Sequence, residues 1–119
     1  MALVDVAGVD QLREGVPHVV LVGRREIVLV QTDGTVFALR NVCPHQTQSF
    51  GSGIVRPLIE PGAEPGEITV DRGRPVLACP WHRWEYDLRS GRCVIDPRLR
   101  VRAYRTVVDC DRVLIEMTS

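Results

Sequence analysis

Two short cysteine-histidine segments, Cys43-Pro44-His45 and Cys79-Pro80-Trp81-His82, constrain this chain more than any other feature. They contain two of its four cysteines and two of its three histidines. The close spacing lets a thiolate and an imidazole reach one metal centre from a single loop, and the proline after each cysteine stiffens that loop. We therefore expect any fold of this chain to bring both loops to one metal site, with Cys43, His45, Cys79 and His82 as its ligands.

Two kinds of metal group use this set of ligands. Two thiolates and two imidazoles complete a closed tetrahedral zinc site. The same four side chains suit a Rieske-type 2Fe-2S cluster, in which two histidines replace two cysteines on one of the irons. The local sequence favours the cluster, because zinc requires neither the proline after each cysteine nor the aromatic residues Trp84 and Tyr86 beyond His82.

The residues around both segments strengthen this interpretation. Residues 41–46, Asn-Val-Cys-Pro-His-Gln, and residues 79–91 closely resemble the two cluster-binding loops of Rieske ferredoxins and Rieske domains of oxygenase systems. The likeness continues through Asp96-Pro97 and an Arg- and Val-rich stretch to Glu116. The resemblance implies one Rieske-type 2Fe-2S cluster in an all-β fold of stacked antiparallel sheets, with a small cluster-binding subdomain formed by two loops.

The hydrophobic pattern independently predicts β-structure. Short Val-, Ile- and Leu-rich runs are separated by turn residues, which is typical of a sandwich or barrel of antiparallel strands. We expect strands at 3–6, 16–22, 27–31, 36–40, 54–59, 67–70, 76–78, 84–87, 100–108 and 113–117. Turns are predicted at Gly23-Arg24, Asp33-Gly34, Ser90-Gly91 and Asp111-Arg112. One helical turn is predicted within Val9–Glu14, with Asp10 as its cap.

The chain has the length of one domain, which we place at residues 1–119 with cluster-binding loops at about 41–53 and 79–91. The segment between the ligand pairs is longer than in compact Rieske ferredoxins. We expect an insertion hairpin at about 54–73, because two β-rich runs flank the turn-forming residues 61–66. Our hypothesis places this hairpin near the cluster, where it would help to select the partner; a merely tolerated surface insertion is the alternative.

Two departures from the resembled pattern concern the loops. Arg83 stands where relatives usually carry glycine, and its charge beside His82 favours the reduced, more negative cluster. The run 47–50, Thr-Gln-Ser-Phe, replaces a Gly- and Pro-rich run.

Two tryptophans bear on the reduction potential of the cluster. Trp81 and Trp84 stand where high-potential relatives have a half-cystine and a sulfide-bonding serine. We therefore expect a potential in the lower part of the Rieske range of about −150 to +300 mV.

Tyr86 stands at a position whose phenol can bond a ligand sulfur in this family. An ordinary core aromatic is the alternative role. Cys93 and Cys110 remain outside the ligand set, and we expect both to be structural thiols of a reducing compartment, small core residues rather than a disulfide.

The charge composition gives no reason to expect nucleic acid or an anionic membrane as a partner. The formal net charge is zero, so nothing draws the chain to nucleic acid or to an anionic membrane. The longest apolar run, Val19 to Val22, is far too short to span a bilayer. The first residues show no signal-peptide pattern, so we expect a cytoplasmic protein.

All fifteen basic residues are arginines, and seven of them lie between Arg83 and Arg105. Solvated strand faces explain any one of these arginines. Together they would form a basic rim that suits transient docking of an acidic redox partner.

The shortage of further histidines excludes the catalytic iron site of a Rieske oxygenase. A Rieske oxygenase needs a mononuclear iron held by two histidines and a carboxylate, and only His18 is left after the cluster ligands. A Gly-x-Gly-x-x-Gly nucleotide fingerprint is also absent from the sequence. We therefore expect a Rieske-type ferredoxin, a one-electron carrier between a flavin-dependent reductase and an oxygenase or other redox enzyme, and not an enzyme. The alternatives are a tightly bound small redox subunit similar to that of nitrite reductase, and a zinc-stabilised interaction module.

Overall fold

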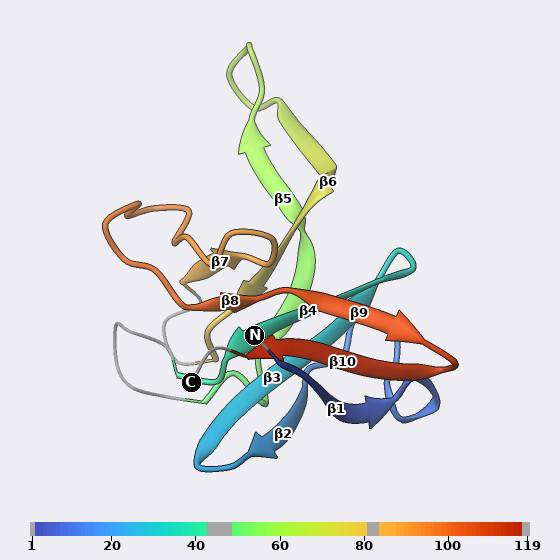
Figure 1. Cartoon of the computed structure of the whole chain (residues 1–119). Helices are drawn as coiled ribbons and strands as arrows, with labels where there is room; N and C mark the ends of the chain where they lie inside the picture. The colour runs from blue at the N-terminus through green and yellow to red at the C-terminus, as the bar shows by residue number, and fades with distance from the viewer. Residues whose placement is uncertain (1, 43–48, 81–83, 118–119) are drawn as a thin grey trace.

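The computed structural model describes residues 2–42, 49–80 and 84–117, whose strands form three antiparallel sheets (Figure 1). The first sheet has the order β1 (Ala2–Gly8), β10 (Arg112–Met117), β9 (Thr106–Asp109). The second has the order β2 (His18–Val22), β3 (Arg25–Thr32), β4 (Thr35–Arg40), β8 (Ala103–Tyr104). The third has the order β5 (Ile54–Pro61), β6 (Ile68–Ala78), β7 (Glu85–Asp87). The predicted all-β fold of stacked antiparallel sheets is confirmed.

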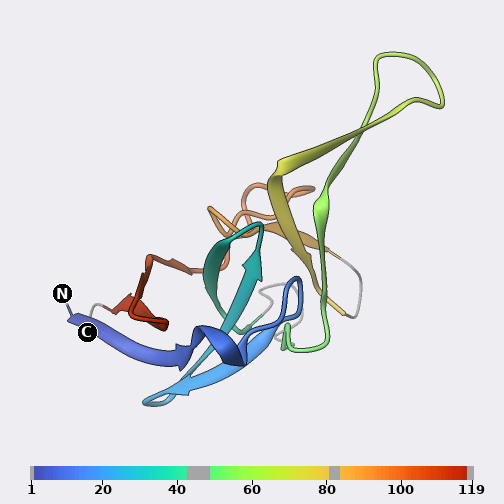
Figure 2. The same cartoon turned by 90° about the vertical axis from the view of Figure 1, so that its right-hand side faces the viewer.

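The second sheet is the middle layer, because both of its faces are apolar. In β3, Ile27 and Leu29 pack against the first sheet, whereas Val28 and Val30 point to the opposite side. Side chains alternate between the faces of a strand, so an unbroken apolar run is buried on both faces. Figure 2 shows β3 and β4 between β1 and β10 on one side and β5–β6 on the other.

Two apolar clusters fill the spaces between the layers. The cluster between the first and second sheets contains Ala7, Leu12, Ile27, Leu29, Val36, Ala38, Tyr104, Val113 and Ile115. The cluster on the other face of the second sheet contains Val28, Val30, Phe37, Leu39, Phe50, Leu77, Cys79, Tyr86, Leu88, Cys93 and Val101. We call this second group the site core, because it includes a candidate ligand and residues on both sides of the candidate loops.

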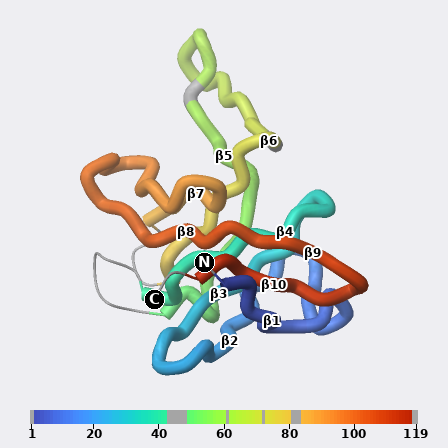
Figure 3. The backbone as a smooth tube through the Cα atoms, viewed as in Figure 1, coloured from blue at the N-terminus to red at the C-terminus, as the bar shows by residue number. Residues whose placement is uncertain are grey.

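The expected insertion hairpin is present and is longer than predicted. β5 pairs with β6 from Ile54↔Ala78 to Pro61↔Ile68, with a register shift after Pro57. The hairpin projects from the body of the molecule (Figures 1 and 3). Its base adjoins Cys79, whereas residues 62–67 form the distant tip. The base of the hairpin therefore lies beside one candidate ligand, and its role in selecting the partner stays a hypothesis.

The turns largely follow the sequence. Gly23-Arg24 connects β2 to β3, and Asp33-Gly34 connects β3 to β4, as predicted. The last hairpin turn is Cys110-Asp111, with φ angles of 50° and 63°, and not Asp111-Arg112. A two-residue turn of type I′ needs positive φ at both positions, and aspartate tolerates this conformation better than arginine.

This turn also corrects the prediction for one thiol. Cys110 is exposed, because the turn carries it away from the sheets, whereas Cys93 is buried as predicted. A pair of core thiols was therefore the wrong expectation for Cys110.

The helical turn is shorter than predicted and has a different cap. A single 3-10 turn, η1 (Val9–Gln11), follows Gly8, whose backbone N–H donates to Gln11 Oε1 at 2.7 Å. Asp10 therefore lies inside the turn and does not cap it. The described residues contain no helix long and apolar enough to cross a membrane.

The predicted strand over 100–108 is two strands. Its first part, β8, pairs with β4 of the second sheet, and its second part, β9, pairs with β10 of the first sheet. The chain passes from one layer to the other at Arg105, whose carbonyl accepts the Glu116 N–H at 2.9 Å. One apolar run can serve two sheets in this way, and the sequence pattern does not show where it divides.

Candidate metal centre

Of the four ligands expected from sequence, the structure describes Cys79. It follows β6 directly, and its side chain is 2% exposed in the site core beside Phe50 and Tyr86. Cys43, His45 and His82 lie outside the described residues, and so do Trp81 and Arg83. The structure therefore informs on this site mainly through the residues that hold the two ligand segments in place.

The second ligand segment is closed by the β6–β7 pair. Ala78 lies opposite Glu85 in this pair, and the Cys79 N–H donates to the Trp84 carbonyl at 2.8 Å. Strand pairing thus fixes both ends of the segment that contains His82. This closure is made by backbone hydrogen bonds.

The first ligand segment is closed by a side chain. Asn41 is 2% exposed, and its amide oxygen accepts the Phe50 N–H at 2.7 Å. Its amide nitrogen donates to Ser49 Oγ at 2.8 Å. Buried amides are stable only when they are hydrogen-bonded, so this geometry holds residues 41 and 49–50 together. We call these two hydrogen bonds the Asn41 clamp.

The sequence analysis missed the Asn41 clamp. A local signal was present, because an amide side chain stands just before the first ligand pair and Ser49 follows just after it. Small polar side chains such as these often bond to backbone groups at the ends of a loop.

An aromatic contact joins the two segments. The rings of Phe50 and Tyr86 meet edge to face, with centroids 5.5 Å apart and an interplanar angle of 79°. Both side chains are fully buried. Edge-to-face pairs of this kind contribute about 0.5–1.5 kcal/mol beyond their buried area. The core role of Tyr86 is thus present, and a bond from its phenol to a ligand sulfur stays a prediction.

Gly53 brings the first segment against the start of the second. A Cβ atom at this position would overlap the Ala78 carbonyl oxygen and lie 3.2 Å from Leu77 Cδ1. The Gly53 N–H also donates to the Phe50 carbonyl at 2.8 Å. Glycine allows this close approach because it has no side chain. The end of one ligand segment therefore packs on the residue that precedes Cys79.

An ion pair connects the outer strands of the third sheet. Arg56 Nε of β5 lies 2.8 Å from Glu85 Oε2 of β7, across the intervening strand β6. Both side chains are partly exposed, so the pair adds no more than about 1 kcal/mol. The pair adds a link between β5 and β7, the strand that follows the second ligand segment.

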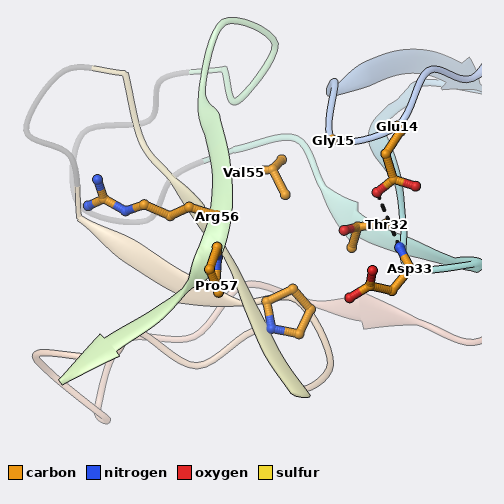
Figure 4. A pocket seen from close by; sticks show the side chains of 8 residues that line it. Glu14, Gly15, Thr32, Asp33, Val55, Arg56 and Pro57 are labelled. Carbon is orange, nitrogen blue, oxygen red and sulfur yellow. Dashed lines mark hydrogen bonds between the residues drawn. The ribbon is translucent and has the colours of Figure 1, made fainter. Parts of the chain in front are cut away.

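A separate hollow lies at the base of β5 (Figure 4). It has a volume of about 220 Å³ and is lined by Glu14, Gly15, Thr32, Asp33, Val55, Arg56, Pro57 and Pro75. Figure 4 shows the Arg56 side chain on the opposite side of β5 from Val55. The lining contains no cysteine or histidine. Among the described residues, no three His, Cys, Asp or Glu side chains gather closely enough to hold a metal ion.

The residues present fit an iron-sulfur cluster. The candidate donors are two thiols and two imidazoles, the mixed set that a Rieske cluster uses. The described thiol is shielded from water, and the two segments that carry the donors are joined by the Phe50–Tyr86 contact and by the packing of Gly53.

The family comparison agrees with this chemistry. The model of the family described as the Rieske [2Fe-2S] domain matches residues 2–105. The chain belongs to the Rieske family. The predicted family and the predicted cofactor, one Rieske-type 2Fe-2S cluster, are both confirmed by this match.

Two similar proteins are ferredoxins. The ferredoxin component of the alkene monooxygenase system of Xanthobacter autotrophicus is 32% identical over 94% of this chain and 79% of its own length. The solved ferredoxin of carbazole 1,9a-dioxygenase from Nocardioides aromaticivorans is 30% identical, with a TM-score of 0.73 and 97% of each chain covered. The predicted class, a ferredoxin of oxygenase systems rather than an enzyme, is confirmed by these relatives.

A third similar structure shows the fold alone. The putative NADH-dependent nitrite reductase small subunit from Mycobacterium tuberculosis has a TM-score of 0.79 at 24% identity, with 99% of this chain and 96% of that chain covered. At this identity, the likeness extends to the arrangement of the sheets and not to a shared role.

Proposed function

We propose that this Rieske ferredoxin carries single electrons from a flavin-dependent reductase to an oxygenase or another redox enzyme in the cytoplasm. The observation that supports the proposal is that protein contacts join the described ends of the two ligand segments, through the Asn41 clamp, the Phe50–Tyr86 contact and the Cys79–Trp84 hydrogen bond. A carrier benefits from ligands that stay in place whether the centre is oxidised or reduced. The domain bounds, residues 1–119, belong to the same proposal.

Four residues would hold the cluster. Cys43 and Cys79 would bind one iron, and His45 and His82 would bind the other. The bound cluster would supply a centre that gains and loses one electron. The site core excludes water from Cys79, and charge and hydrogen bonds near the ligands tune the potential.

The first experiment examines the ligands. The purified protein should be red-brown, and after reduction it should give the low-average-g EPR signal of mixed nitrogen and sulfur ligation. Cys79→Ser should lose the visible absorption, because it removes a thiolate. Cys110→Ser is the matched control, since it removes an exposed thiol elsewhere and should keep the colour. A colourless protein that contains stoichiometric zinc would contradict the proposal.

The second experiment examines electron transfer. NADH, a flavin-dependent ferredoxin reductase and this protein should together reduce cytochrome c, at a rate proportional to the protein concentration. Redox titration should follow a one-electron curve. A protein that holds the cluster but accepts no electron from any such reductase would not be a ferredoxin of this kind.

A second candidate, a permanent small subunit of a larger oxidoreductase, is favoured by one observation. The far part of the β5–β6 hairpin exposes Ile59, Ile68 and Val70, and Ile59 lies directly opposite Val70. An apolar surface of this kind often marks a contact with another protein. Size-exclusion chromatography of the protein from its native host separates the two roles, because a free carrier elutes as a small protein and a subunit elutes with the larger enzyme.

A further inference from the structure

Three arginines surround one open hollow on the surface beside β8. Arg89, Arg100 and Arg102 line it together with Ser90 and Ala103, and its volume is about 510 Å³. All three arginines are exposed. We call this feature the arginine hollow.

The backbone brings the arginines together. Val101 is buried in the site core, whereas its neighbours Arg100 and Arg102 are exposed. The Val101 N–H donates to the Gly91 carbonyl at 2.8 Å, which places this stretch beside the turn that carries Arg89. Gly91 has a φ angle of 77°, and a Cβ atom there would overlap the Val101 carbonyl oxygen. Glycine at this position therefore keeps the two arginine-bearing stretches in contact.

Two of the guanidinium groups are oriented by aromatic rings. The Arg89 guanidinium lies 5.4 Å from the Phe37 ring centroid, and its Nε donates to the Gly73 carbonyl at 3.2 Å. The Arg102 guanidinium lies 5.1 Å from the Tyr104 ring centroid. Stacking on a ring orients a guanidinium and leaves its positive charge in place.

Carboxylates neutralise other arginines of the same part of the chain. Arg98 pairs with Asp96 at 3.0 Å, and Arg105 reaches Glu116 at 4.0 Å. In the part of the chain that the structure describes, Arg89 and Arg100 form no ion pair. The positive charges of Arg89 and Arg100 are therefore available to an external group.

The hollow adjoins the first ligand segment. The Arg102 carbonyl accepts the Arg40 N–H at 2.9 Å, and Arg40 directly precedes Asn41 of the clamp. A partner bound at the hollow would thus lie beside the stem of that segment.

We propose that the arginine hollow is a docking site for surface carboxylates of an acidic partner protein, an inference that rests on the proposed electron-carrier function. Guanidinium groups bind carboxylates through paired, charge-assisted hydrogen bonds, which gives the contact a direction as well as strength. Complementary charge also raises the rate of association and favours one orientation of the encounter. The hollow would align the partner beside the ligand segments.

The test uses a fluorescein-labelled peptide of eight glutamates, with an octalysine peptide as the negative probe. Fluorescence anisotropy should show that the cluster-containing protein binds the glutamate peptide and not the lysine peptide. Arg100→Glu with Arg102→Glu should weaken binding by about tenfold or more. Arg24→Glu with Arg25→Glu is the matched control, because it makes the same charge change at the exposed β2–β3 turn and should leave binding nearly unchanged.

Arg100→Glu alone provides a second variant, since Arg102 also stacks on Tyr104 and the double variant perturbs that contact. It should weaken binding less than the double variant and more than the control. Equal affinity of the parent, both hollow variants and the control would overturn the proposal. Visible absorption recorded on the same samples separates the two hypotheses, because a colourless protein contradicts the electron-carrier function, whereas a coloured protein that ignores the peptide contradicts the hollow.

Discussion

The amide oxygen of Asn41 accepts the backbone N–H of Phe50 at 2.7 Å, and this hydrogen bond spans the segment that carries Cys43 and His45. Phe50 then contacts Tyr86, which follows the other ligand segment. One buried amide and two rings thus form a continuous path from one ligand segment to the other. These contacts join the described ends of the two ligand segments.

Removal of the Asn41 side chain should loosen the first ligand segment. Asn41→Ala leaves the buried Phe50 N–H without its acceptor, so we expect the free energy of unfolding to fall by about 1–3 kcal/mol. Chemical denaturation of the cluster-containing protein measures this change. Ser49→Ala removes the acceptor of the second bond and of the exposed Gly51 N–H, leaves the buried Phe50 N–H paired, and should cost less. If both variants matched the parent, the Asn41 clamp would have no stabilising role.

Tyr86→Phe examines the predicted contact of the phenol with a ligand sulfur. Hydrogen bonds to sulfur stabilise the reduced cluster, so loss of the hydroxyl should lower the reduction potential. The ring itself is retained, and with it the edge-to-face contact with Phe50. Redox titration followed by visible absorption gives the potential. An unchanged potential together with unchanged stability would leave Tyr86 as a core aromatic alone.

Gly91→Ala should strongly destabilise the fold. The new Cβ atom would overlap the Val101 carbonyl oxygen, and the φ angle of 77° already disfavours alanine. Gly66→Ala is the matched control, because Gly66 has a φ angle of 81° at the hairpin tip with no atom near the added carbon. Backbone strain alone costs roughly 1–2 kcal/mol. Thermal unfolding should therefore show a larger loss for Gly91→Ala, and equal losses would mean that the 99–101 stretch moves aside freely.

Asp5 and Arg112 should contribute to stability only when the carboxylate is ionised. Arg112 Nη2 donates to Asp5 Oδ1 at 2.8 Å, and this bond holds the pKa of Asp5 below its ordinary value. A lowered pKa in the folded state gives stability that is complete above the pKa of the unfolded chain and is lost as the pH falls through the folded value. Asp5→Asn should thus reduce the acid sensitivity of the melting temperature at low salt. Asp111→Asn at the nearby turn is the comparison, and identical pH profiles for all three proteins would exclude the effect.

Local sequence determined the metal-binding motifs, two hairpin turns and most of the strands of this protein. The paired cysteine and histidine motifs predicted the Rieske family and its cluster, and the turn residues Gly23-Arg24 and Asp33-Gly34 predicted two hairpins at the right positions. The apolar runs gave most of the strands, since strand patterns and two-residue turns depend on neighbouring residues. These features led to the right family and fold class before any contact between distant residues was known.

Tertiary structure decided what depends on residues far apart in the chain. The run Ile27–Val30 reads as a strand, but only the stacking of three sheets shows that both of its faces are buried. Tertiary structure also decided the hydrogen bond between Asn41 and Phe50 and the exposure of Cys110. It likewise brought Arg89 beside Arg100 and Arg102. Each of these depends on which segments pack together, and that packing is chosen by the burial of the whole apolar surface rather than by the preferences of any one segment.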